Sequence, residues 1–135
     1  MSEPKARAAD NEKITINLGF VDLGQIDLLV QEGFYSNRTD FIRTAIRTHL
    51  ATHAEVVKHT VTRRTLALGL HDFSREGLEK IRAAGQTLQI QVLGLARIAD
   101  DVSPELARAT IDSIVVLGVL QASAAVKAAL ADRIH

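Results

Sequence analysis

The chain has 135 residues, enough for one ordinary domain or two small ones, and contains no cysteine. The lack of thiols excludes disulfides, thiolate zinc sites, iron–sulfur ligation and cysteine nucleophiles, so a small domain would depend on dimerisation for its stability. The 16 basic and 16 acidic residues cancel, and this balance neither supports nor excludes nucleic-acid binding.

The first segment, residues 1–11, is polar and lacks the apolar core of a signal peptide. We expect it to form a disordered arm. No run in the chain approaches the roughly 18 apolar residues that span a bilayer, so we expect a cytoplasmic protein without a membrane partner.

Residues 13–18 alternate polar and apolar side chains around a β-branched centre, which predicts a half-buried strand. One face carries Ile14, Ile16 and Leu18, and the other carries Lys13, Thr15 and Asn17. No second strand is predicted before residue 60, and a lone strand would leave its backbone groups unpaired. The simplest arrangement is a two-stranded antiparallel ribbon formed with the same strand of a second copy, which makes the chain a homodimer.

Two helices are predicted after the strand. Residues 21–31 carry apolar side chains at helical spacing, and Gly33 closes this helix. Ser36 is expected to cap a longer helix over residues 37–58, on which Arg43 and Arg47 share one face. The apolar stripe of this helix joins the apolar strand face in the predicted dimer core, which consists of Ile14, Ile16, Leu18, Ile42 and Ile46.

The strand at residues 13–18, a helix, and then the motif Tyr35-Ser36-Asn37-Arg38-Thr39-Asp40-Phe41-Ile42-Arg43 occur in this order. This arrangement resembles the ribbon-helix-helix family of bacterial regulators, of the CopG, Arc and MetJ type. The resemblance covers roughly residues 12–57, and we assign residues 12–59 to a domain for DNA binding and dimerisation. It implies that the paired strands enter the major groove of double-stranded DNA.

The resemblance also implies two sets of DNA contacts. The base-reading set is Lys13, Thr15 and Asn17, and the phosphate-binding set is Ser36, Asn37, Arg38 and Thr39. The chemistry agrees, because Lys donates to guanine, Asn bonds adenine, and a helix N-terminus suits a phosphate. For the strand residues alone, the alternative is the solvated face of an edge strand. Acidic residues on the first helix predict a modest affinity for a single dimer.

The remaining residues, 60–135, alternate three strands with three helices. Ser74, Ser103 and Ser123 stand at the expected helix starts, and the last strand is predicted over residues 114–120. The final helix is expected to carry Val126, Leu130 and Ile134. This pattern predicts a small α/β domain for oligomerisation or sensing, and an α+β protein overall.

Two short motifs stand out within this half. The alternation of the second strand slips near Gly94, which suggests a β-bulge. Val92-Leu93-Gly94 and Val116-Leu117-Gly118 form a weak internal repeat of one strand–helix unit.

The second half has no Gly-rich phosphate loop, no convincing pair of carboxylates and no nucleophile beside a base, so we expect neither an enzyme nor a cofactor. The order of domains is similar in outline to that of nickel-responsive repressors. Those proteins need histidine and cysteine ligands, however, and His71 is the only histidine between residue 60 and His135. We therefore do not expect nickel sensing.

His49 and His53 are four residues apart, a spacing at which two imidazoles can share a metal ion. The simpler interpretation is that they fill an interface beside the second helix. We therefore expect no metal site.

Three functions remain open. The first is a transcriptional repressor or autoregulator whose second half joins dimers or senses a signal. The second is the antitoxin of a toxin–antitoxin pair, although an apolar, self-sufficient second half argues against it. The third is a scaffold protein that assembles through the strand–helix repeat and binds DNA secondarily.

Overall fold

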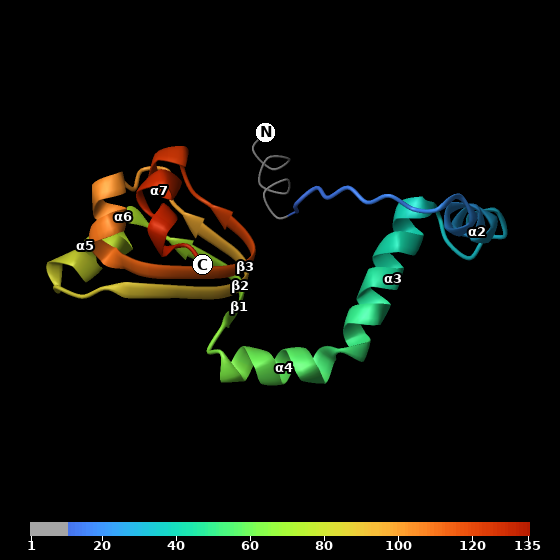
Figure 1. Ribbon diagram of the computed structural model, residues 1–135, viewed down its shortest axis with the longest axis horizontal. Coiled ribbons are helices and arrows are strands. Elements are labelled where there is room, and N and C mark those ends of the chain that lie inside the picture. Colours follow the sequence, from blue (N-terminus) through green and yellow to red (C-terminus); the bar gives the residue numbers. More distant parts are fainter. Residues whose placement is uncertain (1–10) are drawn as a thin grey trace. The chain divides into compact units, whose positions relative to one another are not determined.

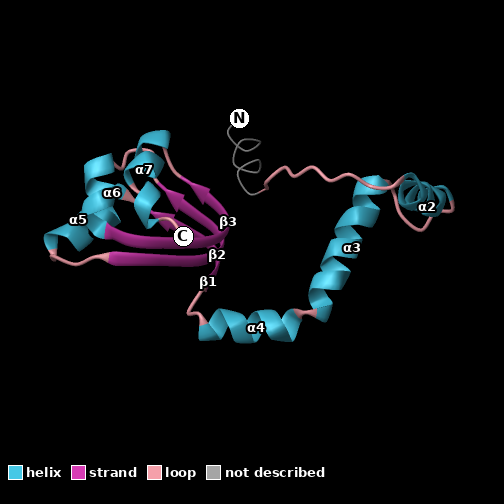
Figure 2. Ribbon diagram, viewed as in Figure 1, coloured by secondary structure: helices cyan, strands magenta, loops and turns pink. Residues whose placement is uncertain are grey.

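The computed structural model describes residues 11–135, so nearly all of the predicted arm lies outside the described residues. These residues divide into two compact units, Asn11–Thr60 and Val61–His135. The first unit is helical, whereas the second combines a sheet with helices (Figure 2). The protein is therefore of the mixed α+β class.

The first unit contains helix α2 (Phe20–Gln31) and helix α3 (Arg38–Thr52), and helix α4 (Ala54–Arg63) follows. The prediction of one continuous helix over residues 37–58 was wrong, because the chain turns at His53. The amide of His53 donates to the carbonyl of Leu50 at 3.0 Å. The hydroxyl of Thr52 donates to the His49 carbonyl at 2.6 Å, a local bond that competes with continuation of the helix.

The segment predicted as a strand, residues 13–18, forms no strand in the single chain. Its apolar side chains face solvent, with Ile14 74% exposed and Ile16 57% exposed. A strand requires a neighbour to pair its backbone groups, and the predicted neighbour is a second copy. The antiparallel ribbon therefore stays a prediction.

The second unit repeats the order strand–helix three times, as predicted. Its elements are β1 (Ala67–Phe73), α5 (Arg75–Ala83), β2 (Leu88–Ile98), α6 (Pro104–Thr110), β3 (Ile111–Gln121), α7 (Ala124–Ala129) and the short 3-10 helix η1 (Ala131–Arg133). The strands form one parallel sheet in the order β1-β2-β3 (Figure 1). The predicted caps are confirmed, since the hydroxyls of Ser74, Ser103 and Ser123 each accept an amide of the following helix.

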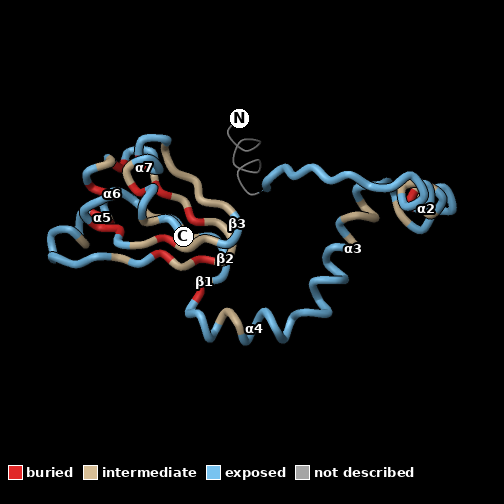
Figure 3. Tube along the Cα trace, in the orientation of Figure 1, coloured by how far each residue is buried: buried red, intermediate tan, exposed pale blue. Residues whose placement is uncertain are grey.

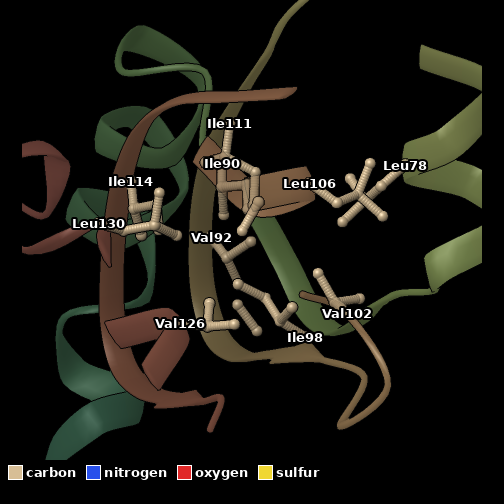
Figure 4. Packing of buried hydrophobic residues seen from close by; sticks show 12 residues of the cluster. Leu78, Ile90, Val92, Ile98, Val102, Leu106, Ile111, Ile114, Val126 and Leu130 are labelled. Atoms are coloured by element: carbon tan, nitrogen blue, oxygen red, sulfur yellow. The ribbon is translucent and has the colours of Figure 1, made fainter. Parts of the chain in front are cut away.

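The core of the second unit lies between the sheet and its three helices. Parallel strands that follow each other in sequence place their right-handed crossover helices on the same face. Figure 4 shows the resulting cluster, and Figure 3 shows buried residues along the sheet and the helices of this unit. The cluster consists of Leu78, Ile90, Val92, Ala96, Ile98, Val102, Leu106, Ala107, Ile111, Ile114, Val126 and Leu130.

A row of three glycines crosses the sheet, with Gly69 paired to Gly94 and Gly94 paired to Gly118. All three have a positive φ, between 111° and 136°, which favours glycine. The bulge predicted near Gly94 was wrong, because pairing continues through this row and the register shifts between Leu88 and Gln89. Residues 92–94 and 116–118 of the predicted repeat pair with each other in register.

The C-terminal end differs from its prediction in extent. Helix α7 ends at Ala129, and Ile134 forms an isolated parallel bridge with Ile114 at the edge of β3. The guanidinium of Arg108 donates to the Asp132 carboxylate at 2.8 Å and to the Ala129 carbonyl at 2.8 Å. These bonds hold the end of the chain against α6. Strand β3 is also longer than residues 114–120.

Candidate nucleic-acid interface

The turn between α2 and α3 brings together most of the predicted phosphate-binding residues. Asn37, not Ser36, caps α3, because its side-chain oxygen accepts the amide of Asp40 at 2.8 Å. The Asp40 carboxylate in turn accepts the Ser36 amide at 2.9 Å. Ser and Asn are equally good caps, so the sequence could not separate two adjacent candidates. The amides of Arg38 and Thr39 lie in the first turn of α3, where helical amides have no intrahelical acceptor.

Arg38 is engaged within the chain. Its Nε and Nη2 donate to the two carboxylate oxygens of Asp27 on α2, each at 2.8 Å. The hydrogen bond from Arg38 lowers the pKa of Asp27 below its ordinary value, and the pair raises the pKa of Arg38. This bidentate contact joins α2 to α3, so Arg38 has a structural partner in addition to its predicted phosphate role.

A concavity lies at the start of α3, lined by Ser36, Asn37, Thr39, Asp40, Arg43 and Arg47. Thr39, Arg43 and Arg47 are four residues apart in succession and therefore follow one face of the helix. The lining thus contains two guanidinium groups, the positive end of the helix dipole and one carboxylate, that of Asp40, so the balance of charge favours an anion. The i, i+4 spacing had indicated that Arg43 and Arg47 share a face, but only the structure places them beside the predicted phosphate-binding turn.

The predicted base-reading residues lie elsewhere in the single chain. Lys13, Thr15 and Asn17 are exposed, and none of them lines the concavity at the start of α3. The structure therefore brings together Ser36, Asn37 and Thr39 with the two arginines, and leaves the strand residues separate.

The first unit buries few apolar side chains. Among the described residues of this unit, Ile26 is the only buried hydrophobic residue. Ile42 is half-buried, and Ile46 is exposed, like the apolar residues of the predicted strand. Leu50 of α3 and Val57 of α4 are exposed as well.

The rings of His49 and His53 lie edge to face with centroids 5.1 Å apart, and both residues are exposed. Over residues 11–135, no group of three or more histidine or carboxylate side chains is arranged to hold a metal ion. Within the same range, no helix is both long and apolar enough to cross a membrane.

The chain matches a known protein family over most of its length. Residues 9–127 match the model of the ribbon-helix-helix transcriptional regulator family. No curated protein and no solved structure matches the chain. The matched range covers the first unit and most of the second, and so extends well beyond the roughly 12–57 covered by the sequence resemblance. The chain therefore belongs to the ribbon-helix-helix family of DNA-binding transcriptional regulators.

Proposed function

We propose that this regulator is a homodimeric, sequence-specific repressor or autoregulator that inserts a β-ribbon into the major groove. Residues 13–18 of two copies form the ribbon. The DNA-binding and dimerisation domain comprises residues 12–59. Residues 60–135 form a second domain that joins copies of the protein.

The observation that carries the proposal is the exposed apolar surface of the first unit. Ile14, Ile16 and Leu18 alternate along an unpaired segment, and Ile46 is exposed on α3. A unit as small as residues 11–60 that leaves such surface in water gains little free energy from folding alone. A second copy would cover both sets of side chains and supply the missing backbone partners of the segment.

The other face of the ribbon would read the bases. Two symmetric copies of Lys13, Thr15 and Asn17 would point away from the dimer core because side chains alternate along a strand. A major groove admits a two-stranded ribbon, and these three side chains provide an amine donor, a hydroxyl or methyl, and an amide with both donor and acceptor.

The concavity at the start of α3 would hold the DNA backbone. The amides of Arg38 and Thr39 and the guanidinium groups of Arg43 and Arg47 supply donors for a phosphate. Arg43 and Arg47 thus extend the proposed phosphate-binding set of Ser36, Asn37, Arg38 and Thr39. Such contacts fix the position of the protein on DNA and carry no sequence information themselves.

The test first selects the operator from random DNA sequences. It then compares two sets of alanine substitutions by DNA-binding titrations on the operator and on unrelated DNA. The triple variant Lys13→Ala, Thr15→Ala, Asn17→Ala should lose discrimination while a salt-sensitive affinity remains. The double variant Arg43→Ala, Arg47→Ala should weaken binding to both DNAs and flatten the dependence on salt by roughly 0.9 for each phosphate that the protein no longer neutralises.

The matched control is Arg82→Ala, which removes an exposed arginine from α5 in the second unit. It should leave both affinity and salt dependence unchanged. Unaltered discrimination by the folded triple variant would show that another surface reads the DNA. An Arg43, Arg47 variant that behaves like the Arg82 control would remove the concavity from the proposed interface.

The folded second unit also bears on the alternatives. Its twelve-residue buried cluster is complete within one chain, whereas a segment that folds only on a toxin would have no such core. This core favours the regulator over the antitoxin.

A further inference from the structure

The sheet of the second unit has one covered face and one open face. Ile90, Val92, Ala96 and Ile98 of β2 point into the core beneath α5, α6 and α7. Because side chains alternate along a strand, the intervening residues of β2 point the other way. The pairing register then places their neighbours on β1 and β3 on this same open face.

The middle of the open face is apolar. One row across the sheet is Leu68, Leu93 and Leu117, and the next is Leu70, Leu95 and Val119. Leu68 is 67% exposed and Leu117 is 44% exposed, so solvent reaches both outer strands of the first row. The described helices of this unit contribute their buried residues to the opposite face.

The ends of the open face are polar but internally matched. Arg97 donates to Asp72 at 3.3 Å and to Gln121 at 3.2 Å, so the arginine and the aspartate of this row are already paired. The opposite end carries the uncharged residues Gln89 and Ser113. A face without excess charge does not suit DNA, whereas an identical apolar face is a suitable partner.

The area of the open face indicates how many face-to-face contacts a stable assembly needs. Strands about 4.8 Å apart that rise about 3.3 Å per residue give the three-stranded face about 400 Å² per copy. One pair of faces would bury about 800 Å² in total, the size of a weak contact, whereas two pairs formed together would bury about 1,600 Å², typical of a stable interface. Two dimers that meet through both pairs of faces reach this size.

We infer that the open faces of the sheets pack against each other between copies and join two ribbon dimers into a tetramer. Leu68, Leu70, Leu93, Leu95, Leu117 and Val119 form the centre of each contact. The inference rests on the proposed N-terminal dimer, because the dimer supplies two faces at once. The tetramer would bind two adjacent operator sites with cooperativity.

The experiment measures the mass of the full-length protein by light scattering over a wide range of concentrations. The wild type should reach the mass of four chains. The variant Leu70→Glu, Leu117→Glu should stop at two chains, because carboxylates at both positions would be buried in the contact. The control Ala125→Glu, on the exposed start of α7, should retain four chains. Binding to a single operator site should be the same for all three proteins.

A second measurement applies even if the double variant fails to fold. The chain has no cysteine, so L117C and A125C each introduce a single reactive thiol. Maleimide should label L117C about tenfold or more slowly than A125C at concentrations where tetramers form, because reaction waits for dissociation. Dilution should remove the difference.

Two results would overturn the inference. One is a wild type that never exceeds two chains, and the other is an L117C thiol as reactive as that of A125C at every concentration. Failure of the proposed DNA-binding function is distinguishable, since it would appear as an absence of operator binding in a protein whose mass is unchanged.

Discussion

The pairing of Arg38 with Asp27 connects two helices through side chains eleven positions apart in the sequence. Both side chains are about half-exposed, so solvent screens the pair and its contribution to stability is small. The direction in which this stabilisation changes with pH is nevertheless defined. The pKa of Asp27 is lowered in the folded chain by the hydrogen bond from Arg38, so stabilisation is present above the ordinary value of 3.8 and disappears as the pH falls through the lowered pKa.

We therefore expect Asp27→Asn to lower the thermal unfolding midpoint slightly at neutral pH and to leave it unchanged in strong acid. The two proteins should converge only below the lowered pKa of Asp27, because the wild-type carboxylate is then protonated and the ion pair no longer forms. Circular dichroism melts at several pH values measure the midpoint. Glu32→Gln, which removes an exposed carboxylate at the end of the same helix, is the control. A difference between Asp27→Asn and wild type that persists unchanged into acid would contradict this account.

The strands of the second unit depend on the glycine row for their close approach. A Cβ at Gly94 would overlap the carbonyl oxygen of Gly69, and a Cβ at Gly118 would overlap that of Gly94. Both residues also have positive φ, which strains any other residue. At Gly69 the φ is positive too, but no heavy atom lies within 4 Å of a Cβ built there. A comparison of substitutions at Gly94 and Gly69 therefore separates the effect of steric overlap from that of backbone strain.

This difference predicts which substitution lowers the free energy of unfolding more. Gly94→Ala should destabilise the second unit by about 2–5 kcal/mol through overlap and strain together, and Gly69→Ala by about 1–3 kcal/mol through strain alone. Urea unfolding followed by circular dichroism gives the two free energies of unfolding. Equal decreases would show that the strands move apart easily enough to accept a methyl group at Gly94.

At the scale of the whole molecule, the two units differ in how complete they are. The second unit encloses its own core, whereas the first leaves most of its apolar residues exposed. Figure 3 shows this difference as buried residues throughout the second unit and mostly exposed residues along α2 and α3. We therefore expect the free energy that folds the first unit to come largely from the proposed association with a second copy.

Ile16→Lys tests this dependence, because it would place a charge in the shared core twice per dimer. We expect dimer formation and operator binding to fail together, at a cost of several kcal/mol. The second unit should stay folded, since its core contains no residue of the ribbon. Analytical ultracentrifugation, operator titration and hydrogen exchange over residues 61–135 measure the three outcomes. Thr15→Lys adds the same charge on the opposite face of the segment and should leave the dimer intact. A folded Ile16→Lys dimer that still binds its operator would contradict the shared core.

The sequence by itself determined the order of elements in the second half, because alternation marks the strands and Ser74, Ser103 and Ser123 mark the helix starts through local hydrogen bonds. It also indicated the family, through the motif from Tyr35 to Arg43. Such features depend on neighbours a few residues away and can therefore be predicted from the sequence alone.

Only the tertiary structure decided which side chains from distant segments meet. It paired Arg38 with Asp27, placed Arg43 and Arg47 beside the turn at Ser36, and aligned three glycines across the sheet. It also left one face of that sheet open, because the two right-handed crossovers place α5 and α6 on the other face, where α7 packs as well through Val126. These outcomes depend on strand register and on helix packing, which bring together residues far apart in the chain and leave no local pattern to mark them.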